Sequence, residues 1–325
     1  MAELRELIEA SDLDNLVRHA DGLVASRDWE GLVTMRDMCL EATERGKQVW
    51  GAAHFAEYRL ALDAPADFAI PVIRPGAGRF SNGPLWEVAA STHTWTELQA
   101  ISDPALRALV AHERMLRGDS VADAIVDRTV VDAPLELAEW EPTYPRAVYK
   151  SDRADFPEVE VLTAGSWVEL PDGGGEPSAE NGPVVALLDL VEPWLESSNG
   201  RGEGAAVVGT ALDAIRALGP RRVRLEEISL SSAMAIMAWT GASGGAHGRR
   251  RGAPVGRALA LWTLAALAGL DEDWPVELDE LGEAGQELRW FIWDPGDQVG
   301  GWHFHLAVSD PAEELSWAVS AVDAP

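Results

Sequence analysis

TGASGGAHGRRRGAPVGR, residues Thr240–Arg257, is a glycine- and arginine-rich stretch that separates two strongly apolar segments. The segment before it is ISLSSAMAIMAW (228–239), and the segment after it is ALALWTLAALAGL (258–270). Six glycines between Gly241 and Gly256 allow left-handed turns and close approach of the backbone to a partner. Pro254 favours a helix start. The stretch is therefore predicted to be a loop that joins two core helices.

The charge around this loop differs from that of the rest of the chain. The 325 residues contain 26 basic and 54 acidic side chains, a formal net charge of −28. Between Arg216 and Arg257, however, eight arginines accompany two acids, so this window is about +6 and the remainder about −34. The net charge argues against general nucleic-acid or anionic-membrane binding, because its field repels phosphate. Two interpretations of the basic stretch 216–257 are open: its arginines bind an external anion, or they neutralise carboxylates of the protein itself.

The loop is the main candidate site. Guanidinium groups offer planar donor forks to phosphate or carboxylate, and backbone N–H groups at a helix start add further donors. The predicted anion-binding residues are Gly244, Gly245, His247, Arg249, Arg250, Arg251 and Arg257. A second polar turn, Ser197–Glu203, is a place for auxiliary residues, namely Asn199, Arg201 and Glu203. The structural alternatives are a connector whose arginines pair with surface acids and a helix C-cap with solvated charges.

Other chemistry-bearing residues favour structural roles, and no cofactor or metal is expected. The loop matches neither a P-loop nor a dinucleotide fingerprint. His303 and His305 alternate as paired metal ligands would, but no spacing demands a third ligand. We expect them on an exposed strand face, with Trp302 and Phe304 toward the core. Fourteen tryptophans are attributed to core packing, the alternative being an aromatic pocket formed by Trp290, Trp293 and Trp302.

The expected fold class is α+β, predominantly α, with an N-terminal helical-hairpin array packed on a C-terminal α+β domain. Apolar stripes at helical spacing and short loops predict helical hairpins over residues 1–130. Prolines and glycines predict an acidic connector over 131–182, with possible short strands at 158–162 and 166–170. The α+β domain with the Gly/Arg loop is assigned to 183–325.

The C-terminal domain is expected to mix helices and strands. Helices are predicted over 183–196 and 211–218, and strands over 205–208 and 222–228. LRWFIW (288–293) and WHFHLAV (302–308) flank the turn DPGDQVGG and predict an antiparallel hairpin. Asp310 as N-cap, Pro311 at the first position and Glu313 three residues after the cap predict a final helix.

Three stretches carry a family resemblance. Residues 239–251, RWFIWD (289–294) and GWHFHLAVSDPAEELSWA (301–318) resemble an uncharacterised family of cytosolic proteins from high-GC bacteria. The resemblance implies a bacterial, cytoplasmic protein and one continuous family domain, and it implies no activity.

The composition and the loop lead to two functional hypotheses. The first is a cytosolic binding or scaffold protein whose loop, residues 240–257, binds a small anionic ligand or an acidic protein partner. The alternative is an enzyme acting on a phosphorylated or carboxylated small molecule, with Glu203 or His247 as general base. A third reading, acidic mimicry of nucleic acid, rests on net charge alone. The single cysteine, Cys39, and the charged start of the chain predict a cytoplasmic location without membrane attachment.

Overall fold

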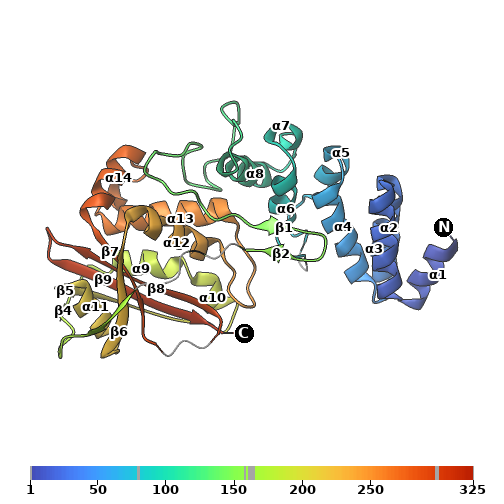
Figure 1. Cartoon of the computed structure of the whole chain (residues 1–325). Helices are drawn as coiled ribbons and strands as arrows, with labels where there is room; N and C mark the ends of the chain where they lie inside the picture. The colour runs from blue at the N-terminus through green and yellow to red at the C-terminus, as the bar shows by residue number, and fades with distance from the viewer. Residues whose placement is uncertain (1, 79–80, 157–158, 160–164, 297–299, 325) are drawn as a thin grey trace. The chain divides into compact units, whose positions relative to one another are not determined.

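The computed structural model describes residues 2–78, 81–156, 159, 165–296 and 300–324 (Figure 1). The chain divides into two compact units. The helical unit comprises residues 1–131 and 147–156, and the sheet unit comprises 132–146 and 157–325. Among the described residues, none of the helices has the length and hydropathy needed to cross a bilayer.

The helical unit is a series of short helices with side-chain caps at several starts. Asp12, Asp28 and Asp103 each accept the backbone N–H of the third residue of the helix that follows, and Thr94 forms a capping box with Glu97. Its elements are α1 (Ala2–Ala10), α2 (Leu13–Ser26), α3 (Trp29–Glu44), α4 (Trp50–Asp63), α5 (Ala66–Ala69), η1 (Ile70–Val72), α6 (Leu85–Thr92), α7 (Trp95–Leu98), α8 (Pro104–Leu116), β1 (Val148–Tyr149) and β2 (Ala154–Asp155).

Helix α4 lies at the centre of the helical unit. It packs against α2, α3 and α6, and it is buried around most of its circumference from Ala52 to Leu62. The buried carboxylate of Glu57 accepts a hydrogen bond from Arg74 at 2.5 Å. A buried charge is tolerated only when it is paired and hydrogen-bonded, so this contact ties the following loop to α4.

The sheet unit is built on a seven-stranded antiparallel sheet of order β3-β6-β7-β8-β9-β5-β4. Strands β7 and β8 form the hairpin expected from the sequence, and Pro254 lies in the first turn of α13 as expected. Its elements are β3 (Ser166–Glu169), β4 (Glu176–Pro177), α9 (Gly182–Asp189), α10 (Glu192–Glu196), β5 (Arg201–Val208), α11 (Ala211–Ala217), β6 (Arg222–Ile228), α12 (Leu230–Ala242), α13 (Ala253–Leu267), η2 (Asp271–Asp273), α14 (Leu278–Glu287), β7 (Arg289–Asp294), β8 (Trp302–Asp310) and β9 (Leu315–Asp323).

Helices cover both faces of this sheet (Figure 1). On one face α9 packs on β5 and β9, while α12 packs on α13 and β7; we call this the α12 face. On the other face α11 packs on β5, β8 and β9 and completes a core with Val207, Phe291, Ala307 and Ala318; we call this the α11 face. Alternate residues of a strand point to opposite faces of the sheet, and here both faces are covered by helices. The central strands are therefore apolar at consecutive positions rather than at every second one.

Two expectations for the C-terminal strands are wrong. The predicted final helix is instead β9, paired with β8 and β5 along its length. Asp310 accepts the N–H groups of Ala312 and Glu313, so it caps the turn between β8 and β9 rather than a helix. His305 is buried rather than exposed, because β8 is a central strand with both faces covered. Trp302 and Phe304 do share the α12 face, and Phe304 is in the core.

The proline-rich region contributes to both units. Residues 132–146 group with the sheet unit, and residues 147–156 with the helical unit. Strands β3 and β4 fall in the predicted connector and form the two edges of the sheet. Most of the possible strand at 158–162 and part of the predicted turn at 294–301 lie outside the described residues. The domain boundaries inferred from composition stay a prediction.

Candidate functional site

The Gly/Arg loop connects α12 and α13, and two of its glycines hold these helices together. A Cβ on Gly256 would lie 2.0 Å from the carbonyl oxygen of Ala238, and one on Gly241 would lie 3.2 Å from the Cα of Gly256. Glycine is therefore required where the two helices cross. Gly252, with φ of +93°, turns the chain into α13. The glycine content thus reflects helix packing at these positions rather than approach to a ligand.

Arg257 belongs to a buried internal ion pair. Its side chain is 1% exposed, and that of its partner Glu141 is 0% exposed. The guanidinium donates to Glu141 at 2.7 and 2.8 Å and to the carbonyl oxygens of Pro134 and Glu136 at 2.7 and 2.6 Å. Burial alone would lower the pKa of Arg257, but the hydrogen bonds and charge of Glu141 raise it. This guanidinium fastens the 132–146 segment to α13.

Arg251 is also used internally. It donates to the carbonyl oxygens of Gly241 at 2.8 Å and Leu190 at 2.7 Å, which end α12 and α9, and it reaches Glu192 at 3.3 Å. Carbonyl groups at helix C-termini carry partial negative charge, so a guanidinium is well suited to them. Burial lowers the pKa of Arg251, and the nearby carboxylates of Glu192 and Asp189 oppose that effect.

The tip of the loop, residues 244–250, is anchored by the protein's own carboxylate. Asp323 is fully buried at the end of β9, and its two oxygens accept hydrogen bonds from the Ala246 N–H at 2.6 Å and the Ser198 hydroxyl at 3.0 Å. Ser198 in turn accepts the N–H of His247 at 3.2 Å. Gly245 has a φ of +70°, and a Cβ there would lie within 2.2 Å of Asp323. The backbone donors of the tip thus already hold an anion.

Two basic side chains of the tip face water. His247 and Arg249 are exposed, and Arg249 makes no side-chain hydrogen bond or ion pair with the residues that the structure describes. Arg250 is half-buried, and its guanidinium carbon lies 5.4 Å from the ring centre of Trp239. A cation over an indole face is stabilised by the ring quadrupole, so Trp239 orients Arg250. The tip therefore carries its positive charge on a fixed backbone.

The auxiliary residues divide between the two faces of the sheet. Asn199 is exposed and follows Ser198, so it lies beside the tip. Arg201 and Glu203 are exposed on β5, opposite Val322 and Ser320 of β9. Along β9, Asp323 points to the opposite face of the sheet from Val322 and Ser320. Arg201 and Glu203 therefore project from the face opposite to the one that holds the tip.

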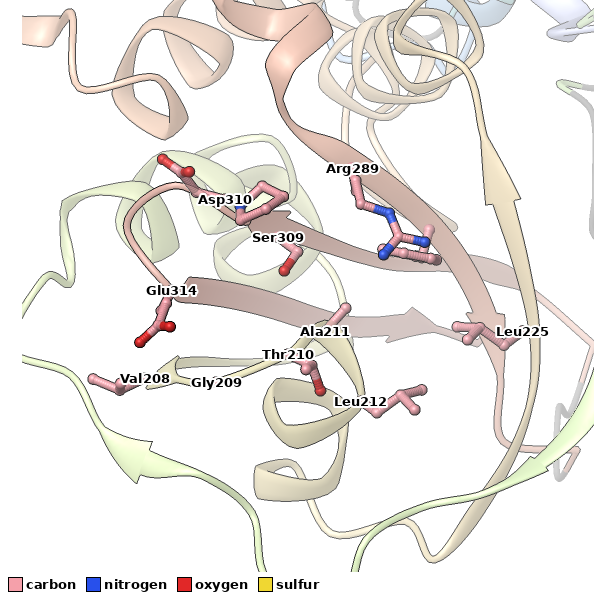
Figure 2. Close-up of a pocket in the computed structure, with 12 residues that line it drawn as sticks. Val208, Gly209, Thr210, Ala211, Leu212, Leu225, Arg289, Ser309, Asp310 and Glu314 are labelled. Atoms are coloured by element: carbon pink, nitrogen blue, oxygen red, sulfur yellow. The ribbon is translucent and has the colours of Figure 1, made fainter.

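A pocket of about 700 Å³, the α11 pocket, lies on the α11 face. Figure 2 shows Arg289 of β7 on one side of it and the first residues of α11 on the other. Several polar side chains in its wall are paired within the protein. Arg289 donates twice to Glu227 at 2.9 Å, Thr210 caps α11 through Asp213, and Ser309 bonds Ser316. Asp310 and Glu314 also line the pocket, and the carboxylate of Asp310 accepts the N–H groups of Ala312 and Glu313. The other lining side chains are apolar: Val208, Ala211, Leu212, Leu225, Phe291 and Pro311.

The remaining histidine and tryptophan candidates are core residues or near it. The His305 ring contacts that of Trp293 at a tilt of 46°, with ring centres 4.6 Å apart, on the α11 face. Trp290 is buried on the α12 face, so Trp290 and Trp293 do not line one pocket. No group of three or more His, Cys, Asp or Glu side chains suited to a metal ion occurs among the described residues.

Sequence reasoning missed the acids that decide which arginines are available. Glu141 is 116 positions from Arg257, and Asp323 is 77 positions from Ala246, so no local pattern links them. The α11 pocket was also missed. Its lining comes from β5, α11, β6, β7 and the turn between β8 and β9, so no local pattern indicates it.

Residues 14–324 match a family whose description is "Family of unknown function (DUF6183)". Because the match spans nearly the whole chain, the protein belongs to this family. No curated protein and no solved structure is significantly similar to the chain. The comparisons therefore supply a family and no activity.

Proposed function

We propose that this family member is a binding protein and that the tip of the Gly/Arg loop binds an anionic ligand or an acidic surface of a protein partner. One observation carries the proposal. Arg249 is exposed and has no ion-pair partner among the described residues, whereas the backbone beneath it is held by Asp323 and Arg251. A guanidinium on a preorganised backbone loses less conformational entropy on binding than one on a mobile loop.

The neighbours of Arg249 support the same ligand class. Arg250 and His247 flank it, and Asn199 adds an amide donor from the adjoining turn. Arg251 and Arg257 are not part of the proposed contact, since their donors are used internally. The ligand therefore meets Arg249 first, and several carboxylates or phosphates on one molecule would also reach the exposed His247 side chain.

The enzyme alternative stays a prediction. Of its two suggested bases, Glu203 projects from the opposite sheet face, so His247 is the base that lies with Arg249.

We also infer a cytoplasmic location from the single cysteine, Cys39. Burial raises the pKa of its thiol to about 11, which fits a packing role.

The test is isothermal titration of the full chain with pyrophosphate, citrate and a hexaglutamate peptide. Arg249→Ala should weaken binding of the best probe by at least about tenfold. Arg221→Ala is the matched control, because Arg221 is another exposed arginine of the sheet unit and lies outside the loop. Raising the salt concentration should weaken binding as well. An unchanged affinity in Arg249→Ala, or no binding of any probe, contradicts the proposal.

The α11 pocket favours a second binding function, for an uncharged apolar small molecule. Its volume is in the range of ligand pockets, and the polar pairs described above leave mainly apolar contact surface. Nile red fluorescence provides the test. Leu212→Trp should fill the pocket and reduce dye binding at least about fivefold, whereas Val185→Trp, at a position 56% exposed on α9, should not. Equal dye binding by both variants contradicts this function.

A further inference from the structure

One edge of the seven-stranded sheet is open along β3, the first strand of the order β3-β6-β7-β8-β9-β5-β4. Leu170, directly after β3, donates its N–H to the carbonyl oxygen of Arg221 at 2.9 Å. In an antiparallel pair, positions that bond to the partner strand in this way alternate with positions whose backbone groups point to the other side. The N–H and C=O groups of Trp167 and Glu169 therefore point away from β6, where they have no hydrogen-bond partner in the part of the chain that the structure describes.

The opposite edge of the sheet cannot be extended in the same way. Strand β4 has only two residues, Glu176–Pro177, and Pro177 has no N–H to donate. Strand β3 has four residues, Ser166–Glu169, and no proline. An added strand therefore fits the β3 edge and not the β4 edge. Because each chain offers one such edge, an assembly in which two copies of β3 pair with each other ends at a dimer.

The side chains at the β3 edge are exposed and carry opposite charges. Trp167 is 47% exposed, and the guanidinium carbon of Arg222 lies 4.5 Å from its ring centre. Glu169 reaches Arg222 at 3.4 Å, and both side chains are exposed, which is a weak surface contact. Arg224, opposite Trp167 on β6, is half-buried and makes no side-chain hydrogen bond or ion pair with the described residues. A carboxylate and a guanidinium on one face of the sheet are thus only partly used within the chain.

We propose that β3 pairs antiparallel with β3 of a second copy, around a two-fold axis at Val168. In this register Trp167 of each copy lies opposite Glu169 of the other, and each of these two pairs exchanges two backbone hydrogen bonds. The two Val168 side chains face each other across the axis. Glu169 of one copy lies in the same row as Trp167 and Arg224 of the other, so opposite charges meet twice. The sheets of the two copies become one continuous sheet.

The size of this contact predicts a reversible dimer. Four residues from each copy form a smaller interface than that of a permanent dimer. The charge of −28 on each copy also opposes association, and salt at about 0.15 M screens that repulsion. The contact uses neither the Gly/Arg loop nor a residue that lines the α11 pocket. Its test is therefore independent of the two proposed binding functions.

The first experiment is sedimentation equilibrium of the full chain at protein concentrations from about 5 to 500 μM, where a small interface should show both monomer and dimer. Glu169→Pro removes an N–H that the monomer does not use, so this variant should stay monomeric. Glu169→Gln is the matched control: it keeps the N–H and loses the charge, and it should weaken association at least about threefold without abolishing it. A wild type that is monomeric at every concentration, or a dimer that persists in Glu169→Pro, overturns the proposal.

The second experiment tests the register by oxidation of cysteine variants with diamide. Val168→Cys should form a disulfide between two copies, because opposite residues of a pair without hydrogen bonds have a suitable Cβ spacing. Ser166→Cys lies on the same face of the same strand, but it would be more than about 10 Å from its counterpart and should stay reduced. The natural Cys39 is buried and serves as the internal reference. Equal cross-linking of the two variants, or none in Val168→Cys, contradicts the two-fold pairing.

Discussion

The base and the tip of the Gly/Arg loop have similar compositions and opposite roles. At the base, Arg251 and Arg257 donate to helix-end carbonyls and to Glu141. At the tip, Arg249 is exposed on a backbone that Asp323 fixes from below. The difference shows that distant acids, rather than the local density of arginine, determine which cations remain available. In this loop the protein neutralises part of its own positive charge and leaves the rest at the surface.

Among the substitutions in the base and the tip, replacing Arg257 should lower the stability of the protein most. Arg257→Met leaves the Glu141 carboxylate buried without its cation, so the free energy of unfolding should fall by about 3–5 kcal/mol. Urea unfolding followed by circular dichroism measures the loss. The double variant with Glu141→Leu should recover much of it, because the stranded charge is removed. Wild-type stability in Arg257→Met would show that the base of the loop is not held by this pair.

Tyr144 offers a pH-dependent test of the same buried cluster. Its hydroxyl donates to Glu141 at 2.6 Å, and burial, with the charge of Glu141, raises its pKa well above the ordinary value of 10.0. Because the folded pKa exceeds the unfolded one, the phenol's contribution is complete below pH 10 and is lost as the pH rises above it. Tyr144→Phe should cost about 1.5–3 kcal/mol at neutral pH and reduce the alkaline decline in stability.

The matched control for that test is Tyr58→Phe in the helical unit. Burial also raises the pKa of Tyr58, but its hydroxyl donates to the carbonyl oxygen of Lys150 rather than to a carboxylate. Urea unfolding at several pH values between about 8 and 11 compares the variants. An alkaline decline that is the same in wild type and Tyr144→Phe would contradict the role given to the Glu141 cluster.

Removing the anchor of the tip should have an intermediate effect. Asp323→Ala deletes the acceptor for Ala246 and Ser198, and it should lower the free energy of unfolding by about 1–3 kcal/mol. Hydrogen exchange is the local readout: the Ala246 amide should lose protection, while amides in the middle of α13 keep theirs. Unchanged protection at Ala246 would mean that Asp323 does not fix the tip.

The smallest effect on stability is expected at Arg249. Because its side chain has no partner among the described residues, Arg249→Ala should change the free energy of unfolding by less than about 0.5 kcal/mol. Arg251→Ala, which removes a partly buried side chain from two helix ends, should cost more. Thermal unfolding of the two variants in parallel gives the comparison, and the reverse order would contradict the division into base and tip.

Local sequence signals predicted much of the secondary structure. The helix start at Pro254 and the β7–β8 hairpin depend on neighbouring residues, so they could be found from short patterns. Asp310-Pro311 fits a turn as well as a helix start, and only pairing of β9 with both β8 and β5 selects the turn. A propensity cannot predict such a choice when tertiary pairing decides it.

The candidate site was predictable only in part, for a related reason. The sequence located the basic loop, but the pairing of Arg257 with Glu141 and of the tip with Asp323 joins segments far apart in the chain. The α11 pocket is likewise formed by residues from several elements, such as β5, α11 and β7. Such sites become visible only once the topology places those elements together.

The most direct test of the division between base and tip is to follow the arginine Nε–H signals by nuclear magnetic resonance while pyrophosphate is added to the ¹⁵N-labelled full chain. The account predicts that the signal of Arg249 shifts progressively with ligand, while those of Arg251 and Arg257 keep their positions. The Arg257 signal should also exchange slowly with water, since that side chain is 1% exposed. A shift at Arg257 as large as that at Arg249, or no shift at Arg249, would contradict the claim.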